Sequence, residues 1–274
     1  NTSFTGEDSF DVSIDAGNAS VAGISELDGN TGGDTLKVDG VSYTFPLGDK
    51  TTVIVGDNTD GSALFTTACA YGGPSNTLDD CGNVNAGITN GGAMVGASYD
   101  FGTGFTIATG YAAGETDMAT GLMTKETLDA YGFNAAYTAD TYGVSITYGL
   151  VETASTVEDT FTAINGYYTP EGFPSISVGY EVGDDGSEAA SADELTSFFV
   201  GLTWDEVGPG SAGIALGTKT PTVEGTDEQY MYEAYYSYPI NDGMTITPLV
   251  FIKEHSASST DDETGVMVKT SFSF

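Results

Sequence analysis

The feature that most constrains this chain is a two-residue alternation of large apolar and small polar side chains. From Ser175 to Val182, every second residue is isoleucine, valine or tyrosine, and serine, glycine or glutamate stands between them. Segments 9–16, 144–150 and 198–204 repeat the alternation. Because neighbouring side chains of a strand point to opposite faces, each segment predicts a β-strand with one apolar face. Helical periodicity is almost absent, so we expect an all-β fold.

The second face of these strands decides what kind of β protein to expect. It consists mostly of Ser, Thr, Gly and Ala, with sparse charges. A soluble sandwich would bury its apolar face and cover the other with Lys and Glu. A small, weakly polar face instead suits the lining of a water-filled barrel whose apolar face meets lipid. We therefore expect a transmembrane antiparallel β-barrel, with a secreted β-sandwich or β-helix as the alternative.

The connections between the strands alternate in length. Tight turns are expected at 47–49, 102–104, 140–141, 170–173, 208–210 and 241–243, and longer connections at 17–33, 58–91, 114–128, 153–160, 184–194, 220–228 and 255–263. Short turns at one rim and long loops at the other are typical of outer-membrane barrels. In a soluble meander nothing enforces this alternation.

The connections define fourteen expected strands. They cover 7–16, 34–46, 50–57, 92–101, 105–113, 129–140, 142–152, 161–169, 174–184, 195–206, 210–219, 229–239, 243–254 and 264–274. Residues 1–5 are interpreted as the end of a further strand that turns at Gly6. A closed bacterial barrel needs an even number of strands, since an open edge leaves backbone groups unpaired in lipid. We expect a single barrel domain over 1–274 with sixteen strands, the first one to two preceding Asn1.

Charge and cysteine content narrow the functional classes. The 40 acidic residues face 6 lysines and no arginine, which gives a net charge of −34 and disfavours a nucleic-acid partner. The two cysteines, Cys69 and Cys81, have no CxxC spacing and no nearby histidine, so we expect a disulfide and an oxidising compartment. No apolar run is long enough for a transmembrane helix, and no signal peptide is visible.

Three stretches carry a resemblance to a known family. Residues 1–6 followed by 15–18, residues 43–56, and the last strand ending in Phe274 resemble cyanobacterial outer-membrane porins, which are grouped with the carbohydrate-selective porins. The resemblance implies passive diffusion of small hydrophilic solutes, mainly inorganic ions, through a homotrimer in the outer membrane of a Gram-negative-type bacterium. Family members carry an upstream domain that binds a peptidoglycan-linked polymer, which we expect to precede this barrel domain.

The longest connection, 58–91, is expected to narrow the pore. In a sixteen-stranded barrel it would join the fifth and sixth strands, where general porins fold a loop into the lumen. Asp60, Asp79 and Asp80 lie on it. A typical porin eyelet sets arginines against such acids; here only Lys219, Lys253 and Lys269, on the inward phase of the last strands, can substitute. Alternatively, Lys219 and Lys253 are solvated charges near the outer rim.

Inward-facing carboxylates favour a cation-preferring pore. Acids with inward phase are Asp11, Asp15, Asp100, Glu181 and Glu233. Rings of acidic residues select cations. A carbohydrate-selective pore is the alternative; it needs aromatic surfaces, and Tyr71 on the long loop is a lone candidate, since Trp204 has outward phase.

Two other functional classes receive weaker support. An outer-membrane barrel enzyme would need a catalytic constellation, and the single histidine, His255, has only Glu254 and Ser256 beside it in the sequence. An acidic secreted adhesin would use clusters such as 261–263, which lack an EF-hand order. We expect no enzyme activity, no cofactor and no metal site beyond weak divalent-cation binding by acidic loops, which would also bridge to lipopolysaccharide.

Overall fold

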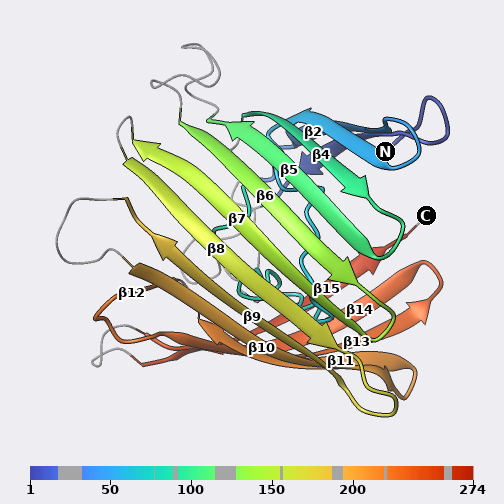
Figure 1. Cartoon of the computed structure of the whole chain (residues 1–274). Helices are drawn as coiled ribbons and strands as arrows, with labels where there is room; N and C mark the ends of the chain where they lie inside the picture. Colours follow the sequence, from blue (N-terminus) through green and yellow to red (C-terminus); the bar gives the residue numbers. More distant parts are fainter. Residues whose placement is uncertain are drawn as a thin grey trace.

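One continuous antiparallel sheet makes up almost all of the structure. The computed structural model describes residues 1–17, 33–76, 78–88, 92–114, 128–154, 157–186, 194–218, 221–255 and 261–273. Within these residues, fifteen strands form a strongly curved wall in which each strand of the main path pairs with the next (Figure 1). The all-β prediction is confirmed. No helix of the described residues is long and apolar enough to cross a membrane.

The strands follow the chain in order. They are β1 (Ser9–Asp15), β2 (Lys37–Pro46), β3 (Thr51–Asp57), β4 (Ala93–Asp100), β5 (Phe105–Ala113), β6 (Asp129–Thr138), β7 (Tyr142–Ala154), β8 (Val157–Tyr168), β9 (Ser175–Asp184), β10 (Glu194–Val207), β11 (Gly210–Thr218), β12 (Thr222–Val223), β13 (Tyr230–Asn241), β14 (Met244–Lys253) and β15 (Glu263–Phe272). All fourteen expected strands are present within a few residues of their predicted bounds.

Two connections differ from the expectation. The predicted loop 153–160 is wrong, because β7 runs to Ala154 and β8 begins at Val157, with Glu152 opposite Glu158. Backbone pairing continues here past the last large apolar residues, since ladder hydrogen bonds do not require an apolar face. The short strand β12 lies within the predicted connection 220–228 and pairs with β10.

Glycine closes the short turns at one rim. Gly48, Gly102, Gly172 and Gly208 all have φ between 64° and 77°, a left-handed conformation that favours glycine. The strand ends that the longer connections join lie at the opposite rim, as Figure 1 shows for β5 and β6 and for β9 and β10. The predicted alternation of short and long connections is therefore confirmed, apart from the β7–β8 hairpin.

The curved sheet remains open along one edge. Within the described part of the chain, β1 pairs with β2 and β15 with β14, and no strand joins β1 to β15. Residues before β1 turn back toward it: Thr2 and Phe10 exchange backbone hydrogen bonds of 2.7 and 2.9 Å. Asp8 fixes this turn by accepting hydrogen bonds from Ser3, Thr5 and Tyr43. The open wall is consistent with a barrel that lacks some of its strands.

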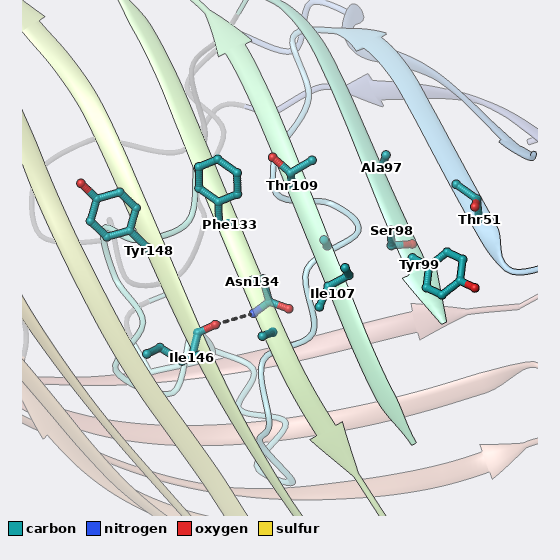
Figure 2. A pocket seen from close by; sticks show the side chains of 12 residues that line it. Thr51, Ala97, Ser98, Tyr99, Ile107, Thr109, Phe133, Asn134, Ile146 and Tyr148 are labelled. Carbon is teal, nitrogen blue, oxygen red and sulfur yellow. Dashed lines mark hydrogen bonds between the residues drawn. The ribbon is translucent and has the colours of Figure 1, made fainter. Parts of the chain in front are cut away.

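The outer face of the wall is apolar. Large side chains in outward phase, such as Val178, Ile146 and Phe133, are 48–59% exposed. Figure 2 shows this surface over β4 to β7, where Tyr99, Phe133 and Tyr148 stand around an apolar hollow of about 620 Å³. Inward neighbours of these residues are buried, and Asn134 donates a hydrogen bond of 3.4 Å to the Ile146 carbonyl. The faces therefore point as the alternation predicts.

Candidate functional site: a loop against the inner face

The connection between β3 and β4 lies against the concave face of the sheet. Its first half crosses the strands in an extended course, and every second backbone N–H meets a wall side chain. Thr66 donates to Asn134 on β6, Ala68 to Ser145 on β7 and Ala70 to Ser177 on β9, at 2.8–2.9 Å. The small polar residues of the inner face thus act as acceptors for loop backbone groups that would otherwise be unsatisfied.

Glu181 holds the second half of the loop. This carboxylate is 2% exposed and accepts hydrogen bonds from both the backbone N–H and the side-chain amide of Asn85, and from the N–H of Ala86. The distances are 2.8–2.9 Å. Hydrogen bonds to a charged acceptor are roughly twice as strong as neutral ones, so Glu181 is the main polar anchor of this limb.

An apolar cluster holds the loop tip. Tyr71 is 4% exposed, its ring centroid lies 5.3 Å from that of Phe199 and 5.6 Å from that of Tyr235, and its phenol donates a 2.5 Å hydrogen bond to Glu233. The cluster also includes Leu78, Cys81, Ala215, Met231, Leu249 and Phe251. Burial raises the pKa of the Tyr71 phenol, with the Glu233 carboxylate as a second cause. Tyr71 therefore has little exposed ring surface for a sugar.

The predicted disulfide is confirmed. Cys69 and Cys81 are bonded, and the bridge joins the limb that leads to Tyr71 with the limb that leads to Glu181. Asn165 on β8 donates a 2.7 Å hydrogen bond to the Cys81 carbonyl, so the bridge also touches the wall. Closing a loop of this length stabilises it by roughly 3 kcal/mol in the chain-entropy model.

Inward glycines mark the route of the loop along the wall. At Gly110 and Gly179 a Cβ would overlap the carbonyl oxygens of Gly61 and Cys81, so only glycine admits the loop backbone so closely. The inward glycines at which a Cβ would meet loop atoms include Gly40, Gly56, Gly96, Gly110, Gly132, Gly149, Gly179, Gly201 and Gly217. Their inward phase is readable from the sequence, but periodicity alone does not show that a loop docks against them.

The loop acids are accessible to water. Asp60, Asp79 and Asp80 all have exposed side chains. The pKa of Asp80 is raised to about 7, first because the surrounding protein removes part of its hydration, and then because Asp79, Asp60 and Glu181 repel its charge. The same loss of hydration raises the pKa of Asp60. Within the described residues, no group of three or more His, Cys, Asp or Glu side chains is arranged to hold a metal ion.

The wall charges that the sequence grouped together occupy different environments. Asp11 accepts a hydrogen bond from Ser9, Asp15 lies opposite Lys37, and Asp100 caps the short turn at Gly102. These three lie away from the loop anchors, whereas Glu181 and Glu233 bind the loop. Two of the five predicted wall carboxylates therefore anchor the loop, and the other three belong to the rest of the inner surface.

The predicted pore-wall lysines also differ in their surroundings. Lys253 is 5% exposed and its ammonium lies 3.0 Å from the Glu263 carboxylate on the adjacent strand, so it is not a solvated rim charge. Lys269 is exposed on the inner face of β15. Lys219 lies outside the described residues, as do Ser256 and Phe274. Glu254, beside His255, accepts hydrogen bonds from Tyr230 and Tyr232.

Comparison with known proteins identifies the fold. No protein-family model and no curated protein sequence matches the chain. Three engineered variants of the porin of Rhodopseudomonas blastica match all of this chain and 87% of their own length, with TM-scores of 0.62, 0.61 and 0.60 at 14% identity. The fold is that of a porin-type β-barrel. A porin-type barrel places the apolar face outside and the loop-bearing face inside, as the two faces of this sheet do.

Proposed function

We propose that the chain is the barrel domain of an outer-membrane porin for passive diffusion of small hydrophilic solutes, mainly inorganic ions. The observation that supports this most is the relation between the faces: an apolar outer surface surrounds an inner surface of hydroxyls, amides and charges, against which the longest described connection is docked. Such a wall allows water and ions inside while lipid covers the outside. We propose that the loop narrows the lumen.

We further propose a preference for cations. Asp60, Asp79 and Asp80 are exposed on the loop, and the protein carries a net charge of −34. Acidic groups that line a narrow passage raise the local concentration of cations. Glu181 and Glu233 contribute less to this effect than their inward phase suggests, because both serve as loop anchors. Burial of Tyr71 argues against a sugar-selective pore built on that residue.

The cellular location and assembly that we propose are those that the family resemblance implies. We propose an outer membrane of a Gram-negative-type bacterium, a cyanobacterium in origin, with lipid and lipopolysaccharide as surroundings, a homotrimeric assembly, and an upstream domain attached to a peptidoglycan-linked polymer. Chemical cross-linking of the detergent-extracted protein tests the trimer: a ladder ending at the trimer supports it, and a monomer alone contradicts it.

Solute size is tested by liposome swelling. Vesicles containing the purified protein are diluted into isotonic solutions of potassium chloride, glucose or a trisaccharide. The proposal predicts fast swelling in the salt, slower swelling in glucose and none above protein-free vesicles in the trisaccharide. No protein-dependent swelling in any solute would contradict a pore, and faster swelling in sugar than in salt would favour the carbohydrate-selective alternative.

A further inference from the structure

A polar recess lies below the loop tip, toward the rim of short turns. Residues 70 and 72–74 of the loop border it, and its walls come from β10, β11, β13, β14 and β15; its volume is about 470 Å³. One lysine stands among hydroxyl groups there. The lining includes Lys269 with Thr203, Ser211, Ser237, Thr245 and Ser271.

Strand register assembles these groups. Ser211 pairs with Ser237 across β11 and β13, and Ser271 pairs with Thr245 across β14 and β15. Lys269 pairs with Thr247, whose hydroxyl donates a 3.3 Å hydrogen bond to Ser237. The hydroxyl residues thus occupy neighbouring positions on the four strands β11, β13, β14 and β15, and Lys269 stands on the last of these strands.

The electrostatic environment of Lys269 differs from that of Lys253. Lys253 is neutralised by Glu263, whereas Lys269 forms no ion pair with any residue that the structure describes. Among the residues that the structure describes, no carboxylate lines the recess. Of the described acids, Glu233 and Asp205 act on Tyr235 in the lining; Glu233 is buried and bonded to Tyr71, and Asp205 follows Thr203 by one inward position toward the rim.

We propose that this recess binds a small oxyanion, with inorganic phosphate as the test ligand. The ammonium offers three donors and a full positive charge, and the lining hydroxyls other than that of Thr247, which donates to Ser237, each offer one more donor; an oxyanion accepts from such a set. Carboxylates, which only accept hydrogen bonds and would repel the ligand, are missing from the described part of the lining. In the proposed pore, such a subsite would retain oxyanions in an otherwise acidic lumen; that consequence rests on the proposed function, whereas the binding does not.

Protection of Lys269 from an amine-reactive reagent tests the binding in the intact protein. The detergent-solubilised chain is acetylated in phosphate or in chloride at equal ionic strength, and the rate at each lysine is followed by mass spectrometry. At a phosphate concentration ten times its dissociation constant, acetylation of Lys269 should slow about tenfold. The exposed lysines Lys37 and Lys50 serve as internal controls and should keep their rates.

Several results would overturn the proposal. Equal slowing at Lys37, Lys50 and Lys269 would show a general ionic effect, and unchanged acetylation of Lys269 would show no binding. Protection by glucose but not by phosphate would assign the recess to sugars instead. Calorimetry on Lys269→Gln should show no phosphate binding, whereas Lys50→Gln, which removes the same charge, should bind as the unaltered chain does.

Conductance and Lys269 protection, measured on the same protein, distinguish failure of the oxyanion site from failure of the proposed pore. If planar bilayers show no conductance while Lys269 remains protected, the porin function fails and the oxyanion site stands. If the protein conducts and Lys269 is not protected, the oxyanion site fails and the pore stands.

Discussion

The Tyr71 phenol donates a 2.5 Å hydrogen bond to Glu233, which lies 162 positions further along the chain. This contact carries the tip of the loop from its origin at β3 to β13 on a distant part of the curved wall. Together with the bonds from Asn85 and Ala86 to Glu181, it uses two inward carboxylates to hold a loop. These two acids therefore set the shape of the inner surface, and the exposed loop acids supply its accessible charge.

Glu181→Ala should release the second limb of the loop. The change leaves the N–H groups of Asn85 and Ala86 without their acceptor in a buried site, which should cost roughly 2–4 kcal/mol of docking free energy. Glu181→Gln retains one acceptor oxygen and should lose less. Hydrogen exchange at these two amides measures the effect. Unchanged protection in Glu181→Ala would show that Glu181 is not the anchor.

Tyr71→Phe should loosen the loop tip without removing its packing. The ring stays between Phe199 and Tyr235, but Glu233 loses a buried donor, at a cost of about 1–3 kcal/mol. Limited proteolysis of the loop should become faster while the barrel resists cleavage. Tyr168→Phe is the matched control, since that residue is 54% exposed on the outer face. Equal cleavage rates in the two variants would contradict the role of the Tyr71–Glu233 bond.

Gly179→Ala should displace the loop more than any change at an outward glycine. Its new Cβ would overlap the Cys81 carbonyl, and the disulfide prevents this limb from moving alone. The Cβ of Gly166→Ala, in contrast, would lie 3.3 Å from the Gly143 carbonyl and touch no loop atom. We expect faster exchange of loop amides in the first variant only. Similar exchange in both variants would mean that docking of the loop does not depend on the inward glycines that it lies against.

Asp80 should make cation preference depend on pH near neutrality. Its pKa is raised to about 7, so the carboxylate gains a proton as the pH falls through that value and the lumen loses a negative charge. Cation preference should therefore be greater at pH 8 than at pH 6. Loop docking changes in the opposite direction, because a raised pKa means that the neutral form is favoured in the docked state and that this contribution is lost as the pH rises through about 7.

The Asp80→Asn variant tests this assignment. It should lose the step in ion selectivity near pH 7, whereas Asp100→Asn, at the rim of short turns, should keep it. Zero-current potentials measured at both pH values supply the comparison. A step that persists in Asp80→Asn would assign the titration to another group.

The sequence was sufficient to predict the wall but only part of the site. Alternation fixed which side chains face inward, including Glu181 and Glu233, because strand geometry leaves two choices. Their role as anchors depends on how the loop folds, which no periodicity encodes. Phe199, Leu249 and Phe251 have inward phase, which does not fit a wholly polar lumen. The docked loop explains them, because they pack in one cluster with its residues Tyr71 and Leu78.

Single-channel recording in planar bilayers, with potassium chloride at different concentrations on the two sides, tests the central claim most directly. Each insertion of a water-filled barrel should raise the membrane conductance in a discrete step. Because the loop that narrows the barrel carries acidic groups, the zero-current potential should have the sign expected when potassium is more permeant than chloride. Absence of steps from protein that retains heat-modifiable migration would contradict the pore, and a potential of the opposite sign would contradict its cation preference.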